Sequence, residues 1–242
     1  MTKYSGADVA FYLIAGLNVV GTLTEFDDRR EAKTERSDGL GDGWEEHAFV
    51  GVREAEITQS GFYDDEANSI HDALSTGPGT TNILAYCLEG TATGAEFVAY
   101  SGGVQVNYHR QAERDGLTKA KAGYRPSGRV EQGIVLQTYK AVGTTGRKGV
   151  VDLGATSTGC AAYLAYNASA GECNVRILHS ASGGTSWQAL LEFTRISSGH
   201  GAERVATTGD VNRYVCADFT TATATGSIGA LNAFVGFVQK PA

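Results

Sequence analysis

The chain has 242 residues and a formal net charge of −7, and 42% of its residues are hydrophobic while 19% are charged. This composition is that of a globular chain, long enough for one large domain or two ordinary ones, and it excludes an intrinsically disordered protein. The acidic balance argues against wrapping of nucleic acid, because phosphate neutralisation needs a surplus of lysine and arginine. The 32 glycines and only 3 prolines favour turns and loops around paired strands.

The first predicted elements are two strands, Val9–Ile14 and Leu17–Leu23, joined by a tight turn at Ala15-Gly16. The next stretch, Glu25–Glu46, carries many charges of both signs and has no apolar face. It is interpreted either as a solvated loop or polar hairpin, or as a long loop that orders against another subunit. In the second interpretation its contact residues are Asp28, Arg29, Arg30, Arg36, Asp42 and Trp44.

A strand with one buried face is predicted at His47–Ser60, where apolar and polar residues roughly alternate. A short helix is predicted at about Ser69–Ser75, with Asn68 or Ser69 as its cap and Gly77-Pro78-Gly79 ending it. Seven residues are too few for a free helix, so this one must brace a sheet. Its apolar stripe consists of Ile70, Ala73 and Leu74.

The rest of the chain predicts further strands separated by glycine-rich turns. In the first half these are Ile83–Leu88, Phe97–Asn107, Thr118–Tyr124 and Ile134–Val142. In the second half they are Cys160–Tyr166, Glu172–His179, Ala202–Thr207, Arg213–Phe219 and Ala230–Val238, with Trp187–Phe193 as a helical turn or a short strand. We therefore expect a mainly β protein, with one β domain at 1–140, a Gly/Thr-rich linker at 141–149 and a C-terminal β-sandwich domain at 150–242.

The sequence contains no pattern of catalytic or metal-binding residues. The five histidines have no metal-ligand spacing, and the serines form no nucleophile motif. The four cysteines are far apart, which favours buried free thiols, although a Cys160–Cys173 bridge stays open. There is neither a secretory signal nor a membrane-spanning stretch. We expect a protein without enzymatic activity, cofactor, metal or membrane partner.

Three places in the chain resemble the major tail proteins, or tail tube proteins, of long-tailed bacteriophages. The opening MTKYSGADVAFYL resembles the start of their tube domain, and the polar loop leading into GVREAEITQSGFYDD is similar to the family's long loop and inner strand. The short helix at 68–74 lies where the family has its single helix. The segments VRILHSASGGTSWQALLEF, AERVATTGDVNRYV and AFVGFVQ resemble the C-terminal β domain of some members.

The resemblance implies a tail-tube-type β-sandwich or barrel whose rings stack into a hollow tube, the conduit for genome ejection. Partners would be further copies of the chain, other tail proteins at the tube ends, and double-stranded DNA that passes without specific binding. Rings would hold six chains, or three if a weak echo of the strand-turn-helix order in the second half is a true duplication. The protein would be made in the host cytoplasm and reside in the virion tail. The alternative is a carbohydrate-binding capsid decoration or host-adhesion module, with Trp187, Tyr163 or Tyr166 as the sugar platform.

Overall fold

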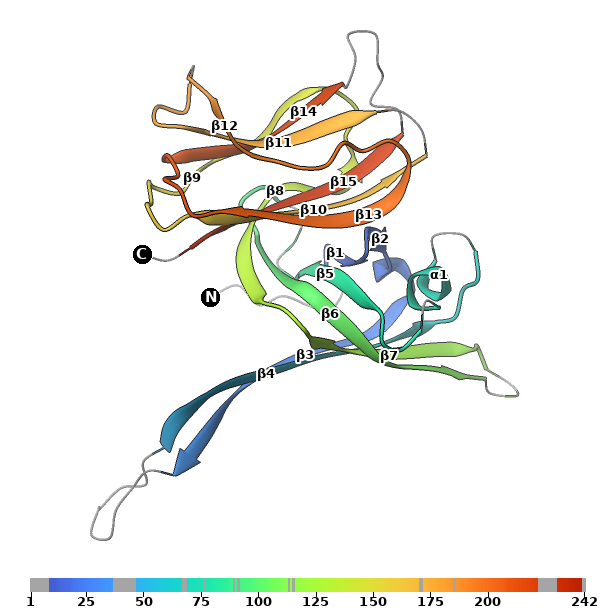
Figure 1. The fold of residues 1–242 in the computed structure, drawn as a ribbon. Coiled ribbons are helices and arrows are strands. Elements are labelled where there is room, and N and C mark those ends of the chain that lie inside the picture. Colours follow the sequence, from blue (N-terminus) through green and yellow to red (C-terminus); the bar gives the residue numbers. More distant parts are fainter. Residues whose placement is uncertain are drawn as a thin grey trace, which may run out of the picture.

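The protein is described by a computed structural model covering residues 9–36, 47–66, 69–75, 77–88, 90, 92–112, 114, 116–169, 172–184, 186–221 and 230–240. It is mainly β, as the sequence predicts, with antiparallel strands and one short α-helix among these residues (Figure 1). For residues 33, 35, 36 and 47–52 only the backbone is described. We call residues 9–126 the N-terminal unit and residues 130–240 the C-terminal sandwich.

The N-terminal unit is built on one sheet that folds back on itself. Its elements are β1 (Phe11–Ile14), β2 (Leu17–Asn18), a 3₁₀ turn (Val20–Thr22), β3 (Leu23–Arg36), β4 (His47–Phe62), α1 (Ile70–Leu74), β5 (Thr81–Cys87), β6 (Glu96–Gln111) and β7 (Lys119–Pro126). The hydrogen-bonded neighbours run β2-β1-β5-β6-β7-β4-β3. We call its last four strands the β6–β7–β4–β3 layer. Ile70, Ala73 and Leu74 of α1 are buried.

The C-terminal sandwich has two four-stranded sheets. Its strands are β8 (Val130–Ala141), β9 (Gly146–Asp152), β10 (Cys160–Ala168), β11 (Cys173–Ser180), β12 (Gln188–Glu192), β13 (Gly199–Thr207), β14 (Tyr214–Thr221) and β15 (Leu231–Gln239). One sheet has the order β13-β10-β15-β8 and the other β12-β11-β14-β9. Since β8 also pairs with β6, the first of these sheets continues into the N-terminal unit.

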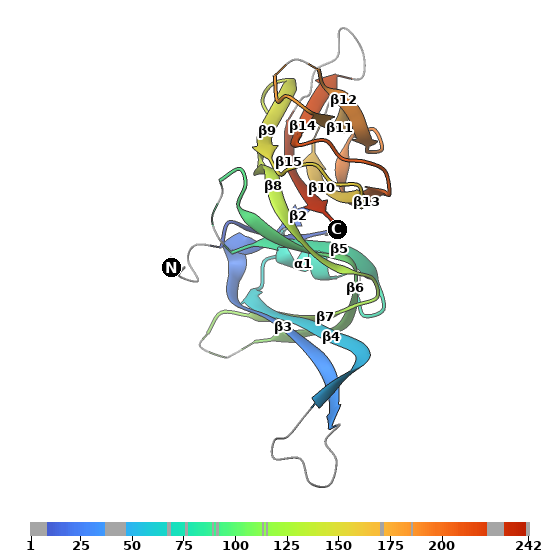
Figure 2. The same cartoon turned by 90° about the vertical axis from the view of Figure 1, so that its left-hand side faces the viewer.

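Several strands are buried on both faces, which explains their continuous apolar runs. In β1, Tyr12 and Ile14 face the core of the N-terminal unit, whereas Phe11 and Leu13 face the C-terminal sandwich. Strands β5, β6, β10 and β15 alternate in the same way between two apolar clusters. The middle cluster therefore joins the two units, which Figure 2 shows stacked one above the other.

Glycines allow the close approach of backbones at this junction. Gly16 lies in the predicted turn at φ 92°, and a Cβ there would collide with the carbonyl oxygens of Tyr166 and Gly201. The ring of Phe97 occupies the space that a Cβ would need at Gly236. The junction is therefore packed too closely to accept side chains at these positions.

Three sequence predictions need correction. The predicted strand Leu17–Leu23 is a two-residue strand followed by a 3₁₀ turn. The segment Glu25–Glu46, interpreted as a loop or a polar hairpin, is a strand as far as Arg36 and pairs with β4, so this part forms one side of a polar hairpin. Residues 146–149 of the expected linker belong to β9. The open choice at Trp187–Phe193 is resolved as a strand, β12, so the short helix is not repeated there.

Candidate functional site

Among the described residues nothing is arranged for metal or thiol chemistry. No group of three or more His, Cys, Asp or Glu side chains could hold a metal ion. The four cysteines are buried and free, so the Cys160–Cys173 bridge is not formed. Burial raises the pKa of Cys160 and of Cys173 to about 11, which keeps both thiols protonated and unreactive at neutral pH. No described helix is long and apolar enough to cross a membrane.

The most distinctive feature of the surface is a projecting ribbon formed by β3 and β4 (Figure 1). Residues Ile57–Phe62 of β4 pair with β7 as well as with β3, but residues 47–56 pair with β3 alone. We call 29–36 and 47–56 the arm. Its two strands extend beyond the sheet that supports their base, so the arm has unpaired backbone groups along both edges.

A carboxylate network holds the base of the arm. Tyr100 donates its hydroxyl to Asp28 Oδ1 at 2.5 Å, and Tyr86 donates to Oδ2. Arg30 Nε donates to Oδ2 at 2.7 Å, and Arg30 Nη2 donates to the Tyr86 hydroxyl at 2.6 Å. We call these four residues the Asp28 cluster. Asp28 is only 9% exposed, and its carboxylate forms an ion pair with the Arg30 guanidinium of the same chain.

The cluster changes the acidity of its tyrosines. Burial first, and then the hydrogen bond to the Asp28 carboxylate, raise the pKa of Tyr86 and Tyr100 well above its usual value. Both phenols therefore stay protonated and keep donating to Asp28. Phe26, two residues before Asp28 on the same face of β3, packs against Tyr12 and Tyr86 with ring centroids 5.0 and 4.8 Å apart. The base of the arm is thus fixed by polar and aromatic contacts together.

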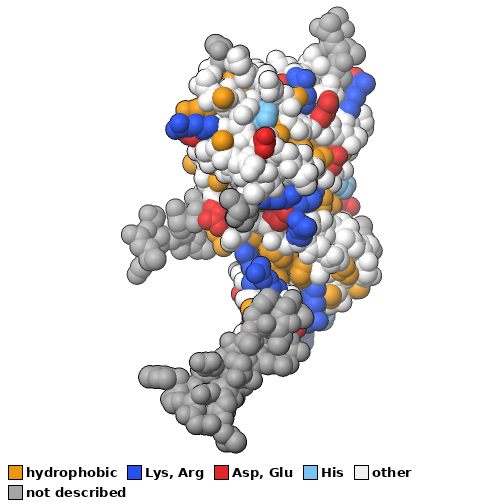
Figure 3. All heavy atoms as spheres, turned by 60° about the vertical axis from the view of Figure 1, so that its left-hand side comes forward, with side chains coloured by type: hydrophobic (Ala, Val, Ile, Leu, Met, Phe, Trp, Pro, Cys, Tyr) orange, Lys and Arg blue, Asp and Glu red, His pale blue; other side chains and the backbone are white. Residues whose placement is uncertain are grey.

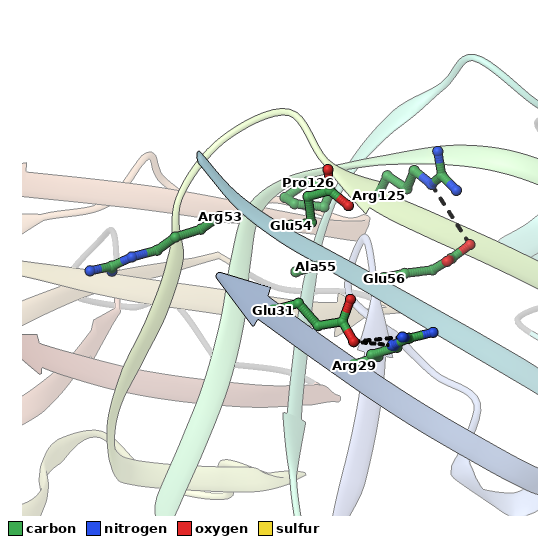
Figure 4. A pocket seen from close by; sticks show the side chains of 8 residues that line it. All are labelled: Arg29, Glu31, Arg53, Glu54, Ala55, Glu56, Arg125 and Pro126. Carbon is green, nitrogen blue, oxygen red and sulfur yellow. Dashed lines mark hydrogen bonds and ion pairs between the residues drawn. The ribbon is translucent and has the colours of Figure 1, made fainter. Parts of the chain in front are cut away.

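The opposite face of the arm is charged and open to solvent. Arg29 is paired with Glu31 on the same strand, at 2.7 Å between Nε and Oε1, and its side chain is 68% exposed. Arg125 of β7 reaches Glu56 of β4 at 3.7 Å. Figure 4 shows these side chains around a hollow of about 470 Å³, which Arg53, Glu54, Ala55 and Pro126 also line. This hollow is shallow and carries no nucleophile.

The residues proposed from the sequence as subunit contacts fall into three groups. Arg29 is exposed on the arm, whereas Asp28 and Arg30 make contacts inside the chain. Arg36 ends β3 and is described by its backbone only. Asp42 and Trp44 lie outside the described residues. The structure therefore separates Asp28 and Arg30, which are held by the tyrosines at the base of the arm, from the more exposed Arg29 within the same charged run.

Sequence reasoning missed the partners of these residues, since Tyr86 and Tyr100 are 58 and 72 positions away from Asp28. It also missed a second network, formed by Glu131 of β8, Tyr163 of β10 and Arg204 of β13. Arg204 donates from Nε to Glu131 Oε2 at 2.7 Å and from Nη2 to Oε1 at 2.8 Å, and Tyr163 donates to Oε2. We call it the Glu131 cluster. The available signal was the polar hydroxyl of Tyr163 in the middle of the mainly apolar strand CAAYLAY.

Two of the three aromatic residues considered for sugar binding make contacts inside the chain. Tyr163 is buried at 1% exposure. Trp187 donates its indole N–H to the Gly184 carbonyl at 3.3 Å, and the Arg147 guanidinium lies 5.4 Å from its ring centroid. The guanidinium thus forms a cation–π contact with one face of the Trp187 ring.

Comparison with known proteins gives structural similarities only. No protein family matches the chain, and no curated protein matches it. The chain is similar to a protein in the tail of an empty gene transfer agent particle with C6 symmetry, at 16% identity and a TM-score of 0.42 over 53% of this chain and 98% of that one. It is similar to a protein in the native gene transfer agent virion, at 14% identity and a TM-score of 0.41 over 53% and 97%. The Dit protein of phage SPP1, a hub adsorption-apparatus protein of phages infecting Gram-positive bacteria, matches 94% of this chain and 98% of its own at 10% identity and a TM-score of 0.33.

Proposed function

We propose that the chain is a structural virion protein that polymerises as stacked rings into a phage-type tail tube, the conduit for genome ejection. The observation that carries this proposal is the β6–β7–β4–β3 layer. One of its faces packs on α1 and the core of the N-terminal unit, its other face is polar, and it has open backbone edges along β3 and along Asn107–Gln111 at the end of β6. In an isolated chain the edge strands of such a layer lack hydrogen-bond partners, whereas in a continuous wall the neighbouring copies would supply them.

The open edges supply the surface for assembly. Strand β3 has 14 residues and pairs only with β4 in the structure as described. At the other side of the layer, Asn107–Gln111 of β6 pairs only with β7. Long unpaired edges invite association with other strands, and a protein that uses them for assembly has no need to cover them. Neighbouring copies would thus extend the layer into a closed wall.

The arm supplies contact between rings. A two-stranded ribbon is marginally stable by itself, so the arm requires a partner along much of its length. We propose that it orders against a neighbouring ring, with Arg29, Arg36, Asp42 and Trp44 among its contacts. The role of Asp28 and Arg30 in this scheme is to hold the base of the arm.

The described residues contain one such layer and one short helix, which favours six chains per ring over three. In this arrangement the polar face of the layer, opposite α1, lines the conduit. DNA passes over mixed charges without a basic groove to hold it. The C-terminal sandwich lies outside the wall, and other tail proteins cap the tube ends. The protein is made in the host cytoplasm, resides in the virion and has no enzymatic activity.

Negative-stain electron microscopy of the purified protein at rising concentration tests the proposal. Tubes of stacked rings are the expected result. Single rings that never stack would contradict the tube, and the proposal would change to a tail component that forms one ring. A protein that stays monomeric and binds a glycan array would show that the carbohydrate-binding alternative is correct.

A shortened arm separates folding from assembly. Replacing residues 32–53 by Asn-Gly keeps the Asp28 cluster and closes β3 and β4 with a favoured two-residue turn. We expect a folded protein with an unchanged thermal transition that forms no tubes. Tubes of normal length from this variant would exclude the arm as the contact between rings.

A further inference from the structure

The polar face of the β6–β7–β4–β3 layer has acidic side chains on its edge strand β3 and lysines on β7, one strand in from the opposite edge, β6. Neighbouring residues in the strand registers define one row across the layer: Glu25, Ser60, Lys121 and His109, in the order β3, β4, β7, β6. Ala120, Ala122 and Tyr124 alternate with the basic residues of β7 and are buried in the core, so Lys119 and Lys121 project from the polar face. At the other edge, Phe26 faces inward, and Glu25 and Asp27 project outward.

These edge charges have no partners within the described part of the chain. Glu25, Asp27 and Lys121 are exposed and Lys119 is half-buried, and none of the four belongs to an ion pair there. By contrast, Arg29 and Glu56, which belong to the arm, and Arg125 of β7 are already paired. The acidic edge is therefore β3. We call β7, with its two lysines, together with the neighbouring edge strand β6 the basic edge.

Strand direction allows these two edges to meet in one uniform orientation. Each strand of the layer is antiparallel to its neighbour. Because there are four strands, the first and the last, β6 and β3, run in opposite directions. When a second copy is placed beside the first without being turned over, its β6 lies antiparallel to β3. Such a contact is head-to-tail, and repeated around an axis it closes into a ring.

We infer that the acidic edge of β3 binds the basic edge of β7 and β6 in a second copy of this chain, with Glu25 and Asp27 facing His109, Lys119 and Lys121. The inference rests on the proposed function, in which copies of the chain form a ring. It adds which edges of neighbouring copies meet and why only one relative orientation of the copies is favoured. Turning a copy over would bring acid against acid and base against base, which is strongly unfavourable at an interface. The charges therefore specify the direction of the ring.

Charge reversal at each edge tests the inference. In E25K/D27K both edges are basic, and in K119E/K121E both are acidic. Each variant alone should need a concentration about tenfold higher or more for assembly at low salt, because each 1.4 kcal/mol of repulsion is a factor of ten. An equimolar mixture of the two should assemble again, since alternating copies restore unlike charges at every contact. The matched control is E192K/D210K, which changes the same number of charges on exposed residues of the C-terminal sandwich.

The outcomes separate this inference from the proposed function. Loss in both reversed variants, recovery in the mixture and an unaffected control would support the pairing of edges. Undiminished assembly of either reversed variant, or no recovery on mixing two variants that keep the wild-type circular dichroism spectrum, would overturn it while leaving the tube intact. A wild-type chain that never forms rings would overturn the proposed function, and the inference with it.

Discussion

The Asp28 cluster and the Glu131 cluster use the same chemistry in two different surroundings. Each has a carboxylate bound by one arginine and by tyrosine hydroxyls, and the two carboxylates are 9% and 10% exposed. The Glu131 cluster joins three strands beside the apolar cluster between the two units. The Asp28 cluster instead holds one end of a ribbon whose other end leaves the fold.

The surroundings of the two clusters determine what the loss of their hydrogen bonds would do to the protein. At the Glu131 cluster, Tyr163 belongs to the apolar cluster that the two units share, so loosening the carboxylate disturbs both. At the Asp28 cluster, Tyr86 and Tyr100 stay packed in the core even when the arm moves. Changes at the first cluster should therefore be felt as global stability, and changes at the second as local opening of the arm.

The largest effect is expected from Gly16→Ala, at the junction that the Glu131 cluster reinforces. The new methyl group collides with two carbonyl groups of the C-terminal sandwich, and φ is positive there. The free energy of unfolding should fall by about 2–4 kcal/mol, measured by chemical denaturation. Gly21→Ala, where a Cβ meets nothing within 4 Å, is the control and should change little. Equal effects of the two substitutions would contradict a tightly packed junction.

Glu131→Gln should have the next largest effect. It removes the charge that receives two hydrogen bonds from Arg204, which is itself 22% exposed. We expect a loss of about 1.5–3 kcal/mol at pH 7, in a single transition shared by both units. Two separated transitions in calorimetry would show that the units unfold independently and that the cluster does not couple them.

Glu131 should also make the stability of the fold depend on pH. Burial acts to raise the pKa of Glu131, but hydrogen bonds from Arg204 and Tyr163 outweigh it and lower the pKa below the ordinary 4.5. Because the folded-state pKa is the lower one, this stabilisation is present in full above the unfolded-state value and is lost as the pH falls through the folded-state value. Denaturation midpoints measured from pH 7 to pH 3 should converge for wild type and E131Q in acid. A constant difference would contradict this origin.

Asp28→Asn should act locally. It weakens the hydrogen bonds from Arg30, Tyr86 and Tyr100 at the base of the arm. Hydrogen exchange in 29–36 and 47–56 should accelerate about tenfold, while the main thermal transition moves little. Acceleration throughout both units would mean that the Asp28 cluster supports the whole fold, like the Glu131 cluster.

Arg29→Ala should have the smallest effect on the isolated chain. The Arg29 side chain is exposed, and its ion pair with Glu31 is surrounded by water. We expect an unchanged melting temperature, measured by calorimetry, together with weaker assembly if the arm contacts a neighbour. A lower melting temperature without any change in assembly would mean that Arg29 stabilises the fold and makes no contact with a neighbouring copy.

The regular parts of the fold could be predicted from the sequence because they have a core face. Leu84 and Tyr86, or Phe97 and Ala99, are apolar since both faces of their strands are covered, and the stripe on α1 is apolar for the same reason. Strand β3 was predicted less well because its outer residues face water on an arm, where nothing selects apolar side chains. Strand β9 was missed because its glycines and lysine, in Gly146–Asp152, hide the alternation of a half-exposed edge strand.

The sequence by itself determined a mainly β chain with one short helix and a long charged segment ahead of it. The tertiary structure decided that Asp28 is an internal residue and Arg29 an exposed one, although they are adjacent in the chain. It also decided that acids and bases gather at opposite edges of one layer. The physical reason is that a strand sends successive side chains to opposite faces, and what each face meets is set by residues as far apart in the chain as Phe11 and Phe234.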